Sequence, residues 1–185
     1  MTEAERDPES MLEALARLGR LTSAWSGGAC LIGGVAISAR VHPRFTRDLD
    51  LLIVVGAEEV GALVELARAT GYDVADLDRE LADAGLVRLP GPAAKAGPAV
   101  DLIVADSGWL EDVVRRATPL DLGSATLPVA TLEDLLLLKL EAHRPQDIDD
   151  ILAIKDAAGG ALDMAYVRDR AAEIGVLDRV RLYLG

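Results

Sequence analysis

Two short apolar runs most constrain what this chain can fold into. Residues 48–55 read DLDLLIVV and residues 99–105 read AVDLIVA, and both have the length of buried strands, since buried helices are usually longer. Helical patterns alternate with such runs until about residue 128, and only helical patterns follow. We therefore predict an α/β (α+β) fold, with a sheet and flanking helices in residues 1–128 and a helical C-terminal section, residues 129–185, packed on that core.

Weaker signals predict further elements. Asp7 and Pro8 indicate an N-terminal helix with Asp7 as its N-cap and the proline at its first position. Short apolar segments at residues 72–75, 86–89 and 125–129 indicate additional strands.

Composition excludes several functional classes. The 185 residues include 31 Asp and Glu against 19 Lys and Arg, a net charge of −12 that argues against general nucleic-acid binding by phosphate neutralisation. Aromatic residues make up 3%, which disfavours a base-stacking surface. One cysteine and two histidines leave little for a metal centre built from those residues. The acidic N-terminus and the lack of a long apolar run favour a cytoplasmic protein that does not bind membranes.

The acidic pair in the first run is the first candidate for chemistry. Asp48 and Asp50 alternate along a strand, so their carboxylates project from the same face and repel each other unless a cation lies between them. Asp101 opens the second run, and a third carboxylate joins the pair if the two strands are neighbours. Such a group favours Mg²⁺ or Mn²⁺, although a solvent-facing strand start would also explain the pair alone. Asp106, at the end of the second run, is expected to cap a helix.

A glycine pair lies between a predicted strand and a predicted helix. At such a corner, Gly33 and Gly34 would let backbone N–H groups approach a phosphate, but an ordinary tight turn is an equally good explanation. The pattern matches neither the Rossmann nor the Walker motif.

Lys139 interrupts the apolar face of a predicted helix. Leucines at helical spacing between residues 132 and 140 form the inward stripe, and Lys139 falls in its middle. A lysine there needs a carboxylate or phosphate partner, unless its ammonium group simply reaches the surface. Downstream, Asp147 and Asp150 share a face of the next helix. Three acids of the helix that contains Lys139 are expected on its solvent face: Glu133, Asp134 and Glu141.

Together these segments resemble the DNA polymerase beta-like nucleotidyltransferase superfamily. The superfamily has a glycine-rich turn, an Asp-x-Asp strand and a later strand carboxylate, and the sequence has GGVAISARVHPRFTRDLDLLIV followed by AVDLIV. The chain is most similar to the AbiEii-type nucleotidyltransferases, the toxin halves of type IV toxin–antitoxin pairs. That branch has an Arg-x-Thr-x-Asp motif that ends at the acidic pair, and Arg44 and Thr46 match it here. It also has an inward lysine followed by an Arg/Asp-rich segment, which is matched by Lys139, Arg144, Asp147 and Asp150.

The resemblance implies a nucleotidyltransferase-type mixed sheet and a Mg²⁺- or Mn²⁺-dependent reaction. A nucleoside monophosphate would pass from an NTP to an acceptor hydroxyl or phosphate, with pyrophosphate released. A tRNA or a protein is compatible as acceptor, and an antitoxin as partner. Two alternatives are a catalytically silent nucleotide- or partner-binding module of the same fold, and a phosphatase. The phosphatase fits less well, because Leu51 and Leu52 follow Asp50 where that class has Gly-Thr.

The resemblance also assigns roles to individual residues. Asp48, Asp50 and Asp101 would hold the metal. Asp101 would also help to deprotonate the acceptor. The remaining residues would bind the substrate. Gly33, Gly34 and Ser38 would contact phosphate, and Arg44 and Thr46 would contact phosphate or base. Lys139 would neutralise charge on the phosphates and Asp147 would orient it.

Overall fold

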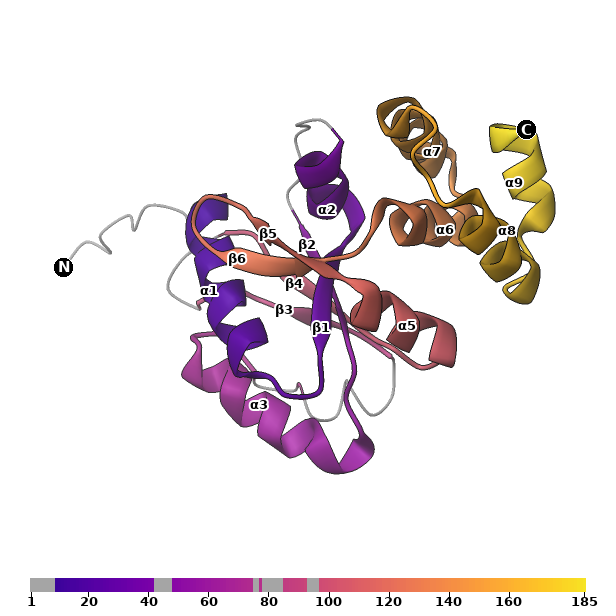
Figure 1. Cartoon of the computed structure of the whole chain (residues 1–185). Helices are drawn as coiled ribbons and strands as arrows, with labels where there is room; N and C mark the ends of the chain where they lie inside the picture. Colours follow the sequence, from indigo (N-terminus) through magenta and orange to yellow (C-terminus); the bar gives the residue numbers. More distant parts are fainter. Residues whose placement is uncertain (1–8, 42–47, 75–76, 78–84, 93–96) are drawn as a thin grey trace.

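The computed structural model describes residues 9–41, 48–74, 77, 85–92 and 97–185. Within these residues the strands form one mixed six-stranded sheet in the order β3-β4-β2-β1-β6-β5, which confirms the predicted α/β class (Figure 1). Their bounds are Ala29–Ile32 (β1), Leu49–Ile53 (β2), Leu86–Leu89 (β3), Val100–Val104 (β4), Thr118–Asp121 (β5) and Thr126–Val129 (β6).

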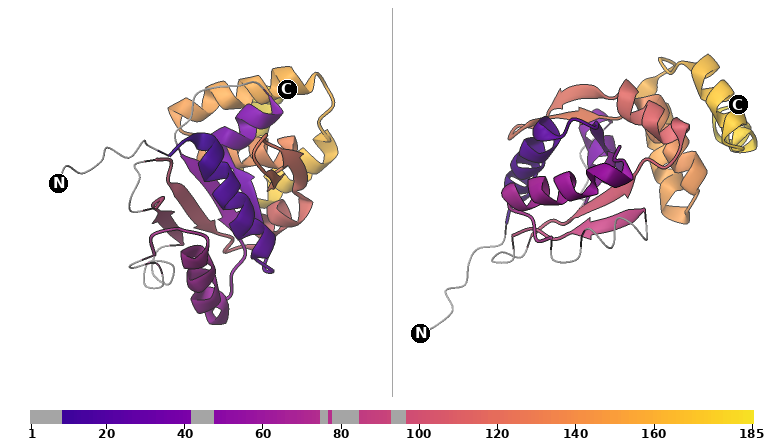
Figure 2. Two further views of the ribbon diagram at one scale, coloured as in Figure 1. Left: turned by 90° about the vertical axis from the view of Figure 1, so that its left-hand side faces the viewer. Right: turned by 90° about the horizontal axis from the view of Figure 1, so that it is seen from below.

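The helices form two groups: one alternates with the strands along the chain, and the other comes after the last strand. The first group comprises α1 (Met11–Ala24), α2 (Gly33–Arg40), the short 3₁₀ helix η1 (Ala57–Glu59), α3 (Val60–Ala69) and α5 (Gly108–Arg116). The C-terminal group comprises α6 (Leu132–Ala142), α7 (Pro145–Ala158), α8 (Met164–Glu173) and α9 (Leu177–Leu184). Figures 1 and 2 show α6–α9 gathered at one end of the molecule and α1 and α3 at the other. The boundary proposed between residues 128 and 129 falls inside β6.

The two apolar runs form the middle of the sheet. β2 pairs with β1 in antiparallel and with β4 in parallel orientation. Leu49, Leu51, Leu52 and Ile53 are fully buried, as expected of a central strand with helices on both faces. The two runs are thus neighbouring strands, which meets the condition on which Asp101 would join the acidic pair.

Several local predictions are wrong. α1 begins at Met11 because Ser10 forms a capping box with Glu13, so the helix does not start at Pro8. Residues 72–74 are not a strand. β5 was not predicted, since it is an exposed edge strand with little apolar content. α5 is capped by Ser107 and not by Asp106.

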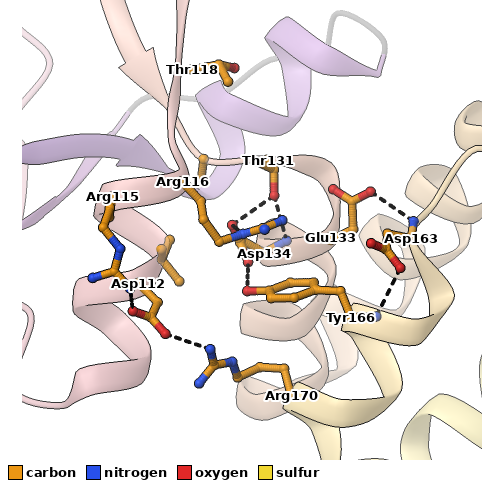
Figure 3. A network of polar contacts seen from close by, with 12 residues as sticks. Asp112, Arg115, Arg116, Thr118, Thr131, Glu133, Asp134, Asp163, Tyr166 and Arg170 are labelled. Carbon is orange, nitrogen blue, oxygen red and sulfur yellow. Dashed lines mark hydrogen bonds and ion pairs between the residues drawn. The ribbon is translucent and has the colours of Figure 1, made fainter.

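A buried network joins the C-terminal helices to the core (Figure 3). Asp134 on α6 is fully buried, so the prediction that it lies on the solvent face is wrong. Its carboxylate accepts hydrogen bonds from Arg116 Nε (3.1 Å) at the end of α5 and from Tyr166 Oη (2.6 Å) on α8. The Arg116 guanidinium also lies 3.8 Å from the centre of the Tyr166 ring. Burial of the acid is tolerated because its charge is partnered, and the network ties α6 to α5 and α8.

None of the helices in the described ranges is both long and apolar enough to span a membrane.

Candidate functional site

Two of the predicted acids lie side by side on neighbouring strands. Asp50 of β2 is the register partner of Asp101 of β4, and on its other side it faces Ile32 of β1. The Asp101 side chain is 25% exposed. Asp48 precedes β2 and is 48% exposed. The structure thus brings Asp50 and Asp101 together at one end of the parallel strand pair.

An arginine that the sequence analysis missed lies across the other two acids. Arg88 on β3 is the register partner of Asp101. Its Nη2 is 2.5 Å from Asp48 Oδ1, and its Nη1 is 3.6 Å from Asp101 Oδ1. The alternation of LVRL places Arg88 on the less buried face of β3, but nothing local indicates two partners so distant in sequence.

The glycine turn is fitted to Asp50. Gly33 has φ +65°, a left-handed conformation that side-chain-bearing residues rarely adopt, and a Cβ there would overlap the Asp50 carboxylate. The backbone N–H of Gly34 donates a hydrogen bond to the same carboxylate. In this structure the turn therefore positions Asp50, and Gly33 also lines the cavity described below.

The electrostatic environment of Asp50 opposes its charged form. Burial raises the pKa of this carboxyl above its ordinary value, and the neighbouring Asp101 carboxylate raises it further. The Gly34 N–H and the Lys139 ammonium act in the opposite direction but do not cancel the rise. A pair of carboxylates with this imbalance is stabilised by an added cation.

Lys139 lies on the inward face of α6, as predicted, and its partners are carboxylates of α7. Its Nζ is 2.9 Å from Asp147 Oδ1 and 2.8 Å from Asp150 Oδ2, and its side chain is 12% exposed. Asp147 is fully buried and also accepts hydrogen bonds from Arg144, through Nε (2.8 Å) and through the backbone N–H (2.9 Å). Burial alone would raise the pKa of Asp147, but the hydrogen bonds from Arg144 and Lys139 prevail and lower it. Asp147 thus holds Lys139 in place.

A cavity of about 650 Å³ connects these groups. Its polar lining includes Gly33, Asp50, Asp101, Lys139 and Arg144. The rest of the lining is mainly apolar and includes Leu86, Ile103, Leu110, Leu135 and Leu138. The cavity has the size range of small-molecule sites and combines charged groups with aliphatic surface.

Other predicted residues lie outside this cavity. Ser38 is on α2, more than one helical turn from Gly33, and does not line the cavity. Asp106 is exposed and does not line it either. Arg44 and Thr46 fall outside the described residues.

The donor set partly fits a hard divalent cation. Asp50 and Asp101 supply the carboxylate oxygens that Mg²⁺ prefers, and burial together with the neighbouring Asp101 carboxylate raises the pKa of Asp50. Among the residues that the structure describes, however, no three His, Cys, Asp or Glu side chains are gathered closely enough to hold a metal ion. Asp48 is engaged by Arg88, so two carboxylates, rather than three, are arranged together.

Comparisons with known proteins agree with this fold. A solved structure with the same fold is the crystal structure of an antigenic nucleotidyltransferase-like protein from Paracoccidioides brasiliensis, with a TM-score of 0.54 and 16% identity. That match covers 78% of this chain and 75% of the other. A search of the curated proteins finds no match. One family model, described as nucleotidyl transferase AbiEii toxin of the type IV toxin–antitoxin system, matches residues 14–174.

This match spans the sheet, the glycine turn, the acidic strands and the helices that carry Lys139 and Asp147. The chain belongs to the AbiEii family of nucleotidyl transferase toxins.

Proposed function

We propose that the protein is a Mg²⁺- or Mn²⁺-dependent nucleotidyltransferase. It transfers a nucleoside monophosphate from an NTP to a hydroxyl or phosphate of an acceptor and releases pyrophosphate. The observation that carries the proposal is the register pair Asp50–Asp101, which faces the same cavity as Gly33 and Lys139.

Asp50 and Asp101 would hold the divalent cation, and Asp48 would complete the set. When bound, the cation supplies Lewis-acid stabilisation of the charge that develops on the transferring phosphate. The raised pKa of Asp50 supports this assignment, since a cation would remove the repulsion between the two carboxylates.

The charge around the cavity supports a requirement for divalent cations. The lining residues and the residues that they bind include six acids: Asp48, Asp50, Asp101, Glu141, Asp147 and Asp150. They include three cationic residues, Arg88, Lys139 and Arg144. A triphosphate brings further negative charge, and Lys139 is already paired with two acids. Without metal the cavity would therefore repel an NTP.

The protein residues have distinct parts in the reaction. The acceptor oxygen attacks the α-phosphorus, the bond from that phosphorus to the bridging oxygen breaks, and pyrophosphate leaves. Asp101, whose side chain is 25% exposed, accepts the proton of an acceptor hydroxyl. Lys139 stabilises the charge on the phosphates, in an orientation set by Asp147. Gly33 lines the cavity, so its backbone would be open to a phosphate bound beside Asp50.

The acceptor is proposed as a tRNA or a protein with a locally docked end. The net charge of −12 disfavours a broad nucleic-acid interface, so an acceptor would enter the cavity by one end. Membership of a toxin family supports an antitoxin protein as a partner.

Labelling with α-³²P-NTPs, Mg²⁺ and pools of tRNA or protein tests this proposal. We expect the wild type and Asp106→Asn to label an acceptor and Asp50→Asn not to, because Asp106 is exposed and outside the cavity. The alternative, a silent nucleotide-binding module, would instead show a higher melting temperature with Mg²⁺ and NTP but no product. Equal labelling by wild type and Asp50→Asn would refute the assignment of the acidic pair.

A further inference from the structure

Arg88 connects two acids that come from different segments. It extends from β3, at one end of the sheet order, and its guanidinium contacts Asp48 just before β2 and Asp101 at the start of β4. These two acids are the ones nearest to Asp50 in sequence and in register, respectively. The guanidinium is thus a cation placed among the three acids of the proposed metal set.

The Arg88 contacts and metal coordination need the same oxygens. The 2.5 Å contact uses Asp48 Oδ1, and the 3.6 Å contact uses Asp101 Oδ1. A divalent cation requires these carboxylates as ligands, and a guanidinium and a cation on the same oxygens repel each other. Among the described residues the three acids do not form a group able to hold a metal ion, and Asp48 is paired with Arg88.

The exposure of Arg88 makes it displaceable. Its side chain is 60% exposed, and an ion pair in that setting is weak and screened by salt. Lys139, by contrast, is 12% exposed and bound to two buried acids, so it is held in place. Of these two cations, Arg88 is the one that can leave.

We propose that Arg88 is a positioning residue that neutralises Asp48 and Asp101 in the metal-free protein and releases them when a divalent cation binds. This inference rests on the proposed function, because it assumes the metal set Asp48, Asp50 and Asp101. It adds that metal binding is opposed by a side chain of the protein and is coupled to movement of that side chain.

Metal binding in the absence of nucleotide tests the inference without relying on activity. Mn²⁺ affinity is measured by electron paramagnetic resonance for the wild type, Arg88→Met and Arg68→Met. Arg68 is a matched control, since it is an exposed arginine of α3 paired with Glu65, and its substitution removes the same charge. We expect Arg88→Met to bind Mn²⁺ about two- to fivefold more tightly than the wild type and Arg68→Met to match the wild type. The difference should shrink at high ionic strength.

A second measurement follows the arginine itself. In ¹⁵N–¹H spectra of the wild type, the Arg88 Nε–H signal, assigned by its loss in Arg88→Met, should shift as Mg²⁺ is added, whereas the Arg68 signal should not. Thermal melting confirms that the variants are folded.

The outcomes separate this inference from the proposed function. Equal Mn²⁺ affinity in wild type and Arg88→Met, with binding lost in Asp50→Asn, overturns the role of Arg88 and leaves the metal site standing. Weaker binding by Arg88→Met overturns it as well. No Mn²⁺ binding to any variant overturns both.

Discussion

Asp50 and Asp101 are register partners on parallel strands, and Gly33 leaves the space that the Asp50 carboxylate occupies. An acid pair this close is costly for a fold unless a cation compensates for it. The same arrangement places the pair at a cavity that Lys139 also lines.

Removing the charge of Asp50 should separate function from stability. Because burial and Asp101 raise the pKa of Asp50, its ionised form weakens the fold, and this cost is present above the folded-state pKa and absent below the unfolded-state one. Asp50→Asn in metal-free buffer at pH 7 should therefore melt at or above the wild-type temperature, while nucleotide transfer falls on the order of 100-fold or more. A melting temperature clearly below that of the wild type would contradict this.

Gly33→Ala should destabilise the protein, whereas Gly61→Ala should not. Gly33 has a positive φ and no room for a Cβ beside Asp50, so the substitution should cost about 1–2 kcal/mol or more in unfolding free energy. Gly61, inside α3, has open space around it, and its replacement should stabilise the protein by about 0.5–1 kcal/mol. Urea unfolding of both variants checks the contrast, and equal effects would argue against the fit of Gly33 to Asp50.

Asp147→Asn should destabilise the protein in a pH-dependent way. The hydrogen bonds from Arg144 and Lys139 lower the pKa of Asp147, so its contribution is fully present above the unfolded-state pKa near 3.8 and is lost as the pH falls through the folded-state pKa. At pH 7 we expect a loss of about 3 kcal/mol, because Lys139 and Arg144 lose a buried carboxylate partner while Lys139 retains Asp150. Urea titrations at several pH values should show this difference unchanged above about pH 5 and smaller below 3.8. A difference that grows on acidification would be inconsistent with the ion pairs.

Tyr166→Phe should weaken the attachment of the C-terminal helices. The hydroxyl donates to the buried Asp134 at 2.6 Å, and burial together with this carboxylate raises the pKa of Tyr166 to about 12. Loss of a hydrogen bond to a charged group should cost about 1.5–3 kcal/mol. Chemical denaturation measures it, and an unchanged free energy of unfolding would mean that this hydrogen bond does not contribute to holding α6.

The parts of the fold that local patterns determine could be predicted from the sequence. β2 and β4 are continuous apolar runs, and Lys139 stands out because helical periodicity alone places it among leucines. β5 could not be predicted, because Pro119 and its exposed neighbours give an edge strand no apolar pattern.

The parts set by long-range contacts could not be predicted. Asp134 looks like a surface acid until Arg116 and Tyr166 are brought to it by other elements. Arg88 pairs with an acid 40 residues earlier in the chain, and no spacing rule connects them. The contact between Lys139 and Asp147 could be predicted, because Asp147 follows only eight residues later, on the next helix.

The proposed nucleotidyl transfer is tested most directly by measuring the transfer of label from α-³²P-NTPs in the presence of Mg²⁺. All four nucleotides are tested with tRNA and protein pools. We expect the wild type and Asp106→Asn to give labelled acceptor and unlabelled pyrophosphate, and Asp50→Asn and Asp101→Asn to give neither. Labelling by Asp50→Asn at the wild-type rate would contradict it.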